Sequence, residues 1–451
     1  MLQQPQHAVL IIVQNLPVPL DRRVWLECQA LTAAGYKVSV ICPKGPDDRS
    51  REVIDRVAIY RYRPAPEARG VLGFVWEFAY SWVRTAWLSV VVSRERGFDI
   101  LQACNPPDTY WALARIWRPM GVRFIYDQHD LNPELFISRF GEPRGLGARL
   151  QYAGLRWLER MTYRSADHVI STNESYRSKA LGRGGKSPDD VTVVRSGPDT
   201  SRMRPIHPRQ DVRRGGDWLL VYLGIMGPQD DVDVVLEVMD ELVHRRGRTD
   251  IRVALLGFGD CLEALRRQST SLGLDPYVEF TGRVGPAEIA DYLSSADVGV
   301  CPDRKTPLND LSTMNKTMEF MAYALPCVSF DLTETRISAG DTALYVEEDG
   351  VAAFADAVEK LLGDDGLRVD MGLRARARVA RDLDWRAQAR AYVATYDSVA
   401  GVDRDRGPSI EATAPAPSPD VTYVDVEDQR ALADFIRDRG RESGRGAGVG
   451  S

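Results

Sequence analysis

The chain has 451 residues, of which 44% are hydrophobic and 27% are charged, as is usual for globular proteins. This length exceeds what one hydrophobic core organises, so at least two domains are expected. The six cysteines are scattered without a Cys-x-x-Cys pair, which argues against a disulfide framework or a structural zinc site and favours a reducing cytoplasm. No charged stretch followed by an apolar one opens the sequence, so no secretory signal is expected.

The net charge of −6 is unevenly distributed along the chain. Residues 1–205 contain 29 basic and 21 acidic residues, whereas residues 206–451 contain 29 and 43. A basic first half and an acidic second half suggest different partners for the two halves. The basic half is suited to an anionic lipid surface or an anionic substrate, although arginines that merely solvate helix faces explain it equally well. No nucleic-acid partner is expected.

The N-terminal part of the chain alternates strands and helices. Residues 8–13 form a continuous apolar run, which is typical of a central parallel strand and too short to cross a bilayer. A helix is predicted from Asp21 to Ala34, ended by Gly35, and a strand follows at residues 38–42. Later strands are predicted at residues 99–102, 123–127, 168–171 and 191–194. This alternation predicts a Rossmann-like domain over residues 1–200.

The same alternation restarts after a linker rich in Pro and Arg at residues 196–210. A strand at 218–224, a helix at 231–246 and a strand at 251–257 begin a second Rossmann-like domain, predicted over residues 210–380. A closing helix is expected within residues 381–400. Residues 401–451 are expected to be a mostly disordered tail with a short helix at 428–437. The predicted fold class is therefore α/β: two tandem Rossmann-like domains facing a central cleft, plus that tail.

One helix of the second domain carries the strongest site signal. Its apolar residues recur at helical spacing from Met318 to Leu325, Pro326 stops it, and residues 327–330 have the pattern of a buried strand. Lys316 and Glu319 lie one turn apart near its start, where a base and a hydrogen-bond acceptor suit a nucleotide sugar. An ordinary exposed salt bridge explains the same spacing, so both interpretations stay open at this point.

Loops that follow strands in the second domain supply further candidates. Glycine loops let backbone amides approach a diphosphate, and one such loop contains Gly224, Met226 and Gly227. The positive charge for that diphosphate is expected from Arg283, Lys305 and Lys316. Asp231-Val232-Asp233 has the look of a metal motif, but it opens a helix, so a capping role is predicted for it. No metal site is predicted.

In the first domain, the loop after the first strand lacks a Gly-x-Gly-x-x-Gly pattern, so no dinucleotide site is expected there. Asp127-Gln128-His129-Asp130 follows a later strand. A lone histidine is commonly structural. This histidine is flanked by two acids at the carboxyl end of a strand, which favours a catalytic role for His129 and Asp130.

Two stretches combine aromatic and basic side chains. Residues 73–92 contain three tryptophans, and residues 149–163 contain Trp157 among several arginines. Helices of this composition can lie on an anionic membrane surface. The buried face of an ordinary α/β domain is the alternative, and it is the preferred interpretation for residues 73–92.

Taken together, the motifs resemble those of glycosyltransferases of the GT-B fold, and in particular the retaining transferases of family 4. The resemblance covers roughly residues 8–400. Four elements in family order carry it, namely residues 14–25, 127–130, 222–227 and 315–322. It implies that the second domain binds a nucleoside-diphosphate sugar and that the first binds the acceptor, at Asn15, Asp21 and Arg22.

The resemblance also implies roles for individual residues. Glu319 matches the second glutamate of the family's Glu-x7-Glu motif, which contacts the donor ribose, and Asn315 lies in the same donor motif. The first glutamate of the motif is replaced by Leu311, so its usual role lacks a residue here. His129 matches a position near the reacting sugar carbon, where a polarising or positioning role is expected. The enzyme is expected to need no cofactor and no metal beyond the nucleotide sugar.

The acceptor implied by the resemblance is a glycan or a lipid-linked glycan. Peripheral contact with an anionic membrane at the inner face of the cell membrane is therefore expected of an otherwise cytoplasmic protein. Two other classes stay open: a nucleotide-sugar epimerase of the same fold, and a non-catalytic scaffold that binds partners through its tail and aromatic helices.

Overall fold

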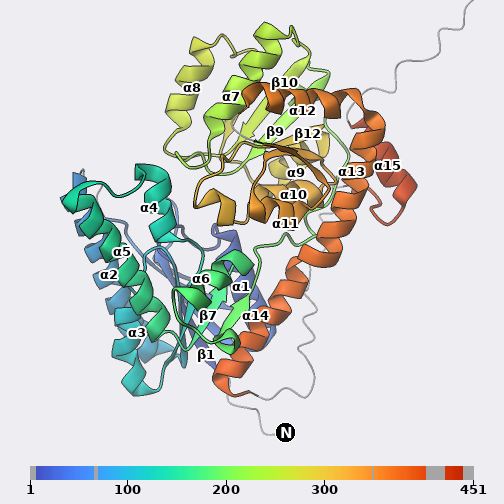
Figure 1. Cartoon of the computed structure of the whole chain (residues 1–451). Coiled ribbons are helices and arrows are strands. Elements are labelled where there is room, and N and C mark those ends of the chain that lie inside the picture. The colour runs from blue at the N-terminus through green and yellow to red at the C-terminus, as the bar shows by residue number, and fades with distance from the viewer. Residues whose placement is uncertain (1–6, 66–69, 348–349, 403–421, 440–451) are drawn as a thin grey trace, which may run out of the picture. The chain divides into compact units, whose positions relative to one another are not determined.

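The computed structural model describes residues 7–65, 70–347, 350–402 and 422–439 (Figure 1). The chain divides into two units. The first contains the chain up to Ser196 and a later segment that begins at Arg386, and the second contains Gly197–Trp385 and residues 422–439, called here the C-terminal segment. The chain therefore passes between the units three times, at Ser196, at Trp385 and between residues 402 and 422.

The first unit is built on an eight-stranded sheet with the order β3-β4-β2-β1-β5-β6-β7-β8. Its strands are β1 (Ala8–Ile12), β2 (Lys37–Pro43), β3 (Arg51–Ile54), β4 (Val57–Tyr62), β5 (Ile100–Cys104), β6 (Arg123–Gln128), β7 (His168–Ser171) and β8 (Val191–Val193). All neighbours pair in parallel except β3 and β4. The strands predicted from apolar runs are confirmed. Central strands of such a sheet are buried on both faces, and every residue of β1 and β5 is buried.

The helices of the first unit are α1 (Arg22–Ala33), α2 (Gly70–Glu95), α3 (Trp111–Trp117), α4 (Asn132–Phe140), α5 (Gly145–Ser165), α6 (Glu174–Gly182) and α14 (Trp385–Ala400). The predicted helix at 21–34 and the closing helix expected within residues 381–400 are confirmed. Gly35, with φ of +91°, ends α1 in the left-handed conformation that glycine adopts most easily. Leu10, Leu101 and Phe124 are among the buried residues of the core beneath these helices.

The antiparallel hairpin of β3 and β4 was not predicted from the sequence. Its two-residue turn is Asp55-Arg56, and both residues have positive φ, of 46° and 68°. Such turns are recognised in sequences by Asn-Gly or Asp-Gly pairs, because glycine adopts positive φ without strain. A turn made by Asp and Arg therefore carries no signal of this kind.

The second unit has a six-stranded parallel sheet with the order β11-β10-β9-β12-β13-β14. Its strands are β9 (Trp218–Leu223), β10 (Ile251–Leu256), β11 (Val278–Gly282), β12 (Val298–Cys301), β13 (Cys327–Phe330) and β14 (Ala343–Val346). Its helices are α7 (Val232–Asp240), α8 (Leu262–Ser271), α9 (Pro286–Ser295), α10 (Asn315–Ala322), α11 (Thr333–Ala339), α12 (Val351–Gly363), α13 (Asp365–Arg378) and α15 (Gln429–Asp438). The predicted α/β fold class with two Rossmann-like domains is confirmed.

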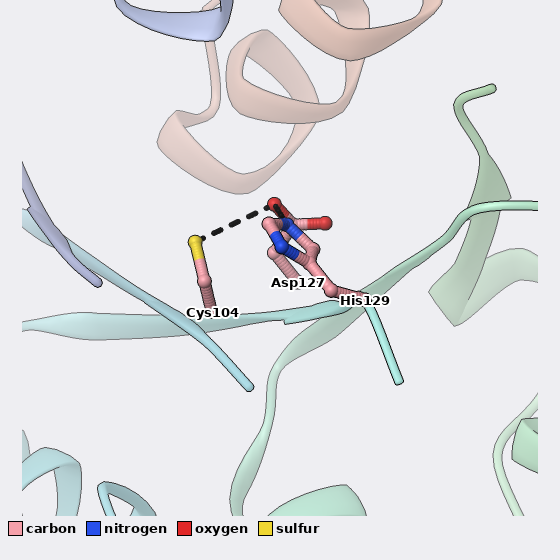
Figure 2. A group of neighbouring side chains, drawn as sticks. All are labelled: Cys104, Asp127 and His129. Atoms are coloured by element: carbon pink, nitrogen blue, oxygen red, sulfur yellow. Dashed lines mark hydrogen bonds and ion pairs between the residues drawn. The ribbon is translucent and has the colours of Figure 1, made fainter. Parts of the chain in front are cut away.

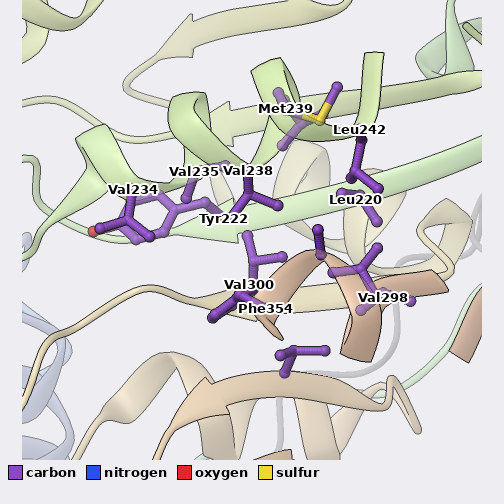
Figure 3. Close-up of a cluster of buried hydrophobic side chains, with 14 of the residues drawn as sticks. Leu220, Tyr222, Val234, Val235, Val238, Met239, Leu242, Val298, Val300 and Phe354 are labelled. Carbon is purple, nitrogen blue, oxygen red and sulfur yellow. The ribbon is translucent and has the colours of Figure 1, made fainter. Parts of the chain in front are cut away.

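Alternate residues of β9 face opposite sides of this sheet, as strand geometry requires. Leu220 and Tyr222 pack with α7 and α12 on one side, where Val234, Val238 and Phe354 are buried (Figure 3). Leu219 and Val221 pack on the other side, in a cluster that includes Met318 and Phe320 of α10. The helix predicted around residue 318 is thus confirmed, and both faces of the sheet are covered.

The C-terminal segment packs onto the second unit. Ile206 pairs with Tyr423 in an antiparallel bridge, and the backbone N–H of Val424 donates to the Pro205 carbonyl (3.0 Å). The helix predicted at 428–437 is confirmed as α15, which lies against α13 (Figure 1). Its Ile436 side chain fits beside Gly372, where a Cβ atom would lie 2.9 Å from it. The remainder of the predicted tail, residues 403–421 and 440–451, lies outside the described residues.

Candidate functional site

In the first unit, polar side chains gather at the carboxyl ends of β5 and β6. Asp127 is fully buried near the end of β6, and the guanidinium of Arg23 from α1 donates to its Oδ1 atom (3.0 Å). Arg23 also donates to the Val194 carbonyl (2.9 Å) and to the Ser196 hydroxyl (2.8 Å). This geometry ties α1 to β6 and to the end of the first unit through one side chain.

His129 follows β6 and is held by its ring and by its backbone. Its Nε2 atom lies 2.7 Å from Asp127 Oδ2 and 3.1 Å from Arg23 Nε. Because Arg23 and His129 outweigh burial and lower the pKa of Asp127, its carboxylate is ionised and can only accept, so the ring N–H donates a hydrogen bond to it. The backbone N–H groups of His129 and Asp130 both donate to Asn105 Oδ1 (2.7 and 3.1 Å). Burial opposes a charged ring, but Asp127 outweighs it and raises the pKa of His129. His129, 15% exposed, is therefore oriented as a hydrogen-bond donor or a cation.

Buried side chains from β5 and α14 also hold Asp127 in place. Gln102 of β5 donates through its amide nitrogen to Asp127 Oδ2 (3.0 Å) and to Glu27 Oε2 (2.9 Å). Its amide oxygen accepts hydrogen bonds from the hydroxyls of Tyr392 (2.6 Å) and Tyr396, both on α14. Because two donors fix the oxygen, the amide nitrogen must face the two carboxylates. Burial, with the Asp127 charge second, raises the pKa of Glu27, so this glutamate tends to keep its proton.

Cys104, Asp127 and His129 lie close enough to be considered as metal ligands (Figure 2). Their ligand atoms lie within 4.8 Å of one another, and the Cys104 thiol contacts Asp127 Oδ2 at 3.6 Å. Both oxygens of Asp127 already accept hydrogen bonds, and the Arg23 guanidinium occupies the space beside them. A cation would have to displace that positive charge, so these three side chains suit a hydrogen-bonded network better than a metal centre.

The three predicted acceptor residues follow β1, whose carboxyl end lies beside that of β5. Asp21 is the N-cap of α1, since its Oδ1 atom accepts from the Val24 backbone N–H (3.1 Å). Asn15 and Arg22 are exposed. Asp130, the second predicted catalytic residue, is half-buried, and burial raises its pKa. Sequence reasoning missed Asp127 and Arg23 as site residues, although both stand within the motifs that it used.

In the second unit, Lys316 of α10 is buried and forms an ion pair with Asp303. Its Nζ atom lies 2.6 and 2.9 Å from the two carboxylate oxygens of Asp303, which follows β12. The same ammonium lies 5.1 Å from the centre of the Tyr222 ring. Burial lowers the pKa of Lys316, but Asp303 outweighs it and the net shift is upward. The alternative of an exposed salt bridge with Glu319 is wrong, because Lys316 and Glu319 are both buried.

The glycine loops after β9 and β10 pack directly against each other. A Cβ atom at Gly257 would lie 1.8 Å from the Gly224 carbonyl oxygen, and one at Gly259 would lie 2.6 Å from that of Met226. The Met226 side chain is buried in the core, and its backbone N–H donates to the Phe258 carbonyl (2.9 Å). Glycine is therefore required at positions 257 and 259 by the contact between the two loops.

Acidic residues surround the start of α7. The backbone N–H of Gly227 donates to Asp230 Oδ2 (2.9 Å), and burial raises the pKa of Asp230 to about 6 although Lys316 opposes that shift. Asp231 occupies the N-cap position of α7, but its carboxylate accepts from the Arg304 backbone N–H (2.8 Å). The prediction that the Asp231 side chain caps α7 is wrong, because its carboxylate accepts from the Arg304 backbone N–H and makes no capping hydrogen bond to α7.

The other predicted donor residues lie on the surface of the second unit. Arg283 is exposed, 5.7 Å from the centre of the Phe258 ring. Lys305 is 61% exposed and pairs with Asp310 at 3.4 Å. Asn315 is exposed at the first position of α10. Of the three predicted cations, Lys316 alone is buried beside the loops after β9 and β12. Its partner Asp303 was missed, because an acid two residues past a strand has no distinctive spacing.

Two protein families match the sequence. Residues 20–197 match the family described as "Glycosyl transferase 4-like domain", and residues 218–364 match the family described as "Glycosyl transferases group 1". The first match covers residues of the first unit and ends at its boundary with the second, and the second match lies within the second unit. The strands and helices that carry His129 and Lys316 thus fall inside the two matched regions.

Similar curated proteins include the D-inositol 3-phosphate glycosyltransferase of Kineococcus radiotolerans, which is 27% identical over 53% of this chain and 58% of the relative. The matched segment thus spans little more than half the length of that relative. The glycogen synthase of Mycobacterium tuberculosis is 24% identical over 84% of this chain and 90% of the relative.

Similar solved structures include sucrose-phosphate synthase from Thermosynechococcus elongatus, with a TM-score of 0.70 and 17% identity over 88% of this chain and 100% of that chain. Another is the Anabaena protein Alr3699/HepE in complex with UDP-glucose, with a TM-score of 0.65 and 15% identity over 87% of this chain and 99% of that chain. At these identities the likeness establishes the fold.

Proposed function

The chain belongs to the GT4-like glycosyltransferases with the GT-B fold, and on this premise we propose that it transfers a sugar from a nucleoside-diphosphate donor to an acceptor hydroxyl with retention of the anomeric configuration. One observation carries this proposal: a buried lysine, paired with Asp303, and the buried Glu319 share the first turns of α10 at the carboxyl edge of the second sheet. The carboxyl edge of an open parallel sheet is where such folds bind ligands.

The two units are proposed to have different roles. The second unit holds the donor, with Lys316 near the diphosphate and Glu319 accepting hydrogen bonds from the ribose. In the reaction, the bond between the anomeric carbon and the diphosphate oxygen breaks. The acceptor oxygen bonds to that carbon on the same face, and its proton passes to the departing phosphate. His129, held by Asp127, is proposed to polarise or position the sugar, and no metal ion is proposed to take part.

The donor is proposed to contain uridine or guanosine diphosphate, and the fold neighbour Alr3699/HepE forms a complex with UDP-glucose. Calorimetry with UDP and GDP in the presence of EDTA tests donor binding. Replacing Lys316 by Met is expected to weaken nucleotide binding roughly tenfold, because it removes a charge-assisted contact to phosphate. Replacing Lys360, an exposed residue of α12, by Met is the matched control, and equal affinities of the two variants would contradict the assignment of Lys316.

The two alternative classes are separated by the products. An epimerase would rearrange the nucleotide sugar without an acceptor, whereas the proposed transferase needs an acceptor hydroxyl other than water. Incubation of the protein with nucleotide sugars alone, followed by analysis of the sugar, distinguishes them. A scaffold would bind neither nucleotide. No feature of the described residues favours either alternative over transfer.

Contact with an anionic membrane is a further part of the proposal. No helix among the described residues is long and apolar enough to cross a membrane. Of the thirteen exposed large hydrophobic side chains in the described part of the chain, ten lie between Trp76 and Trp157. On α2 they recur at Trp76, Val83, Trp87 and Val90, the spacing of one helix face. Leu88 and Val92 of the same helix are buried in the core, so residues 73–92 form the buried face preferred from the sequence and, in addition, an exposed apolar face.

Helix α5 adds charge to the exposed apolar side chains. It exposes Leu146, Leu150 and Trp157 beside four exposed arginines, Arg149, Arg156, Arg160 and Arg164. Its acidic residue, Glu159, is buried and paired with Arg183. An amphipathic helix with this combination suits the headgroup region of an anionic bilayer.

Flotation with phosphatidylglycerol vesicles at low salt tests membrane contact. The wild-type protein is expected to float with anionic vesicles and to remain below neutral ones, because each arginine near an anionic surface contributes about 1 kcal/mol. Replacing Arg149, Arg156 and Arg160 by Gln is expected to abolish flotation. The control replaces three exposed arginines of the second unit, Arg245, Arg266 and Arg381. Flotation that survives the α5 substitutions would contradict the proposal.

A further inference from the structure

The C-terminal segment ends in a buried arginine whose contacts reach the helix that carries Lys316 and Glu319. Arg439 is 1% exposed although it follows the last turn of α15. Its guanidinium donates to four main-chain carbonyls, those of Leu293 (3.1 Å), Ala296 (3.0 Å), Tyr323 (2.8 Å) and Ala324. These carbonyls belong to the carboxyl ends of α9 and α10.

The carboxyl ends of α9 and α10 both require hydrogen-bond donors for their last carbonyls. The last carbonyls of a helix lack partners within the helix and carry partial negative charge. One guanidinium satisfies carbonyls at the ends of both α9 and α10, and the neighbouring Ala322 carbonyl accepts from Arg376 (2.9 Å). Ala324 has a φ of +52°, which is strained for alanine. The chain leaves α10 through a strained residue whose carbonyl oxygen is bound by Arg439.

The rest of the segment holds Arg439 in place. The Arg439 carbonyl accepts from Arg213 (2.6 Å), which pairs with the buried Asp297 (2.7 Å). Leu432 and Ile436 of α15 are buried, and the guanidinium lies 4.8 Å from the centre of the Phe435 ring. Burial lowers the pKa of Arg439, while nearby Asp297 opposes that shift. The buried positive charge thus lies against the carbonyl dipoles at the ends of α9 and α10, with Asp297 nearby.

We propose that Arg439 is a positioning residue for donor binding, and that the C-terminal segment is an integral part of the donor-binding unit. This inference rests on the proposed function. The loop with Arg283 leads into α9, and α10 carries Lys316 and Glu319, so fixing the carboxyl ends of both helices fixes the donor-facing residues at the other ends. Residues near the end of the chain then set the affinity for the nucleotide without touching it.

The test compares Arg439→Met and Arg439→Lys with a matched control on the same helix. Arg437 is exposed and pairs with Asp434, so Arg437→Met removes the same charge without touching α9 or α10. Folding of each variant is checked by circular dichroism and thermal unfolding. Affinities for UDP and GDP are then measured by calorimetry, well below the unfolding temperature of each variant. Hydrogen exchange of the α10 amides is measured in parallel.

We expect Arg439→Met to weaken nucleotide binding roughly tenfold or more, since small displacements of binding groups have large effects. The nucleotide affinity of Arg439→Lys should lie between those of Arg439→Met and the wild type, because an ammonium cannot bridge four carbonyls. The Arg437→Met variant should bind nucleotide with wild-type affinity. Exchange should rise in α10 and stay unchanged in the first unit. A folded Arg439→Met variant with wild-type affinity would overturn the proposal.

Two other outcomes are also decisive. If Arg439→Met does not fold, the affinity of the Lys variant decides, and wild-type affinity there overturns the proposal. If the wild-type protein binds neither nucleotide, the proposed function fails, and α10 exchange alone judges the role of Arg439. Unchanged α10 protection in the variants would then overturn it, and lost protection would support it.

Discussion

At the scale of single residues, both candidate sites depend on buried charges that are held in place by neighbours. Asp127 accepts from Arg23, Gln102 and His129, and Lys316 is bound by both oxygens of Asp303. Removing one member of such a buried group leaves its partner unpaired, which costs more than the net contribution of the pair. Single substitutions at these positions therefore report on neighbouring residues as well as on the residue replaced.

Glu27 gives the protein a specific pH dependence. Burial, with Asp127 second, raises its pKa to about 8 from a usual value near 4.5. The folded state thus keeps a proton that the unfolded state releases, so stability falls as the pH rises from about 4.5 to 8. The Glu27→Gln variant cannot lose this proton, and we expect its unfolding free energy to fall less steeply, by at most about 1.4 kcal/mol per pH unit.

Urea unfolding at several pH values between 5 and 8 measures this difference. The exposed Glu263→Gln variant of the second unit is the control and should follow the wild-type slope. Parallel slopes for wild type and Glu27→Gln would show that Glu27 is ionised in the folded protein. The difference between the two proteins isolates Glu27 from His129, whose raised pKa also reduces stability as the pH rises through it.

At the scale of elements, the sequence was sufficient where a pattern is local. Continuous apolar runs predicted the buried strands β1 and β9, and helical spacing predicted α10. The β3–β4 hairpin escaped prediction because Asp55-Arg56 makes its turn without glycine. The pairing of Lys316 with Asp303 escaped because it joins two elements through the fold, and the nearer Glu319 was the only partner visible in the sequence.

The contact between the two glycine loops provides a prediction about elements. Replacing Gly257 by Ala places a methyl group where the Gly224 carbonyl oxygen lies, so the loops after β9 and β10 must separate. We expect a loss of about 1–3 kcal/mol of stability, as for other overpacked sites, together with weaker nucleotide binding. Chemical denaturation and calorimetry measure the two effects. Gly363→Ala is the control, since nothing outside its chain neighbours and the backbone of its own helix lies within 4 Å of its Cβ position. Wild-type stability and nucleotide affinity of Gly257→Ala would contradict the close contact between the loops after β9 and β10.

At the scale of the whole molecule, each unit is discontinuous in sequence. The first unit is completed by α14, whose Tyr392 and Tyr396 hydroxyls hold Gln102 at a distance of almost three hundred residues along the chain. The second unit is completed by the C-terminal segment, which follows α14. Neither arrangement could be predicted from sequence, because a tyrosine pair or a buried arginine has no local signature of its partner.

Replacing both Tyr392 and Tyr396 by Phe tests the completion of the first unit. The buried amide oxygen of Gln102 then loses both donors, which we expect to cost about 1–3 kcal/mol. Hydrogen exchange should increase in β5 and β6 and remain unchanged in β9–β14. The control is Tyr345→Phe. In the wild-type protein, the Tyr345 hydroxyl donates to the Gly340 carbonyl (2.7 Å) in the second unit. Equal losses of protection in both units would contradict this prediction.

The discontinuity of the first unit also dictates an order of events during synthesis. Residues 7–196 leave the ribosome first, yet Gln102 and the carboxylates beside it lack their tyrosine partners until α14 emerges. At about 5–20 residues per second, that delay is on the order of 10–40 seconds. The sheet of the second unit is synthesised in this interval. The first unit is translated first, but it cannot complete its buried network until most of the second unit has been synthesised.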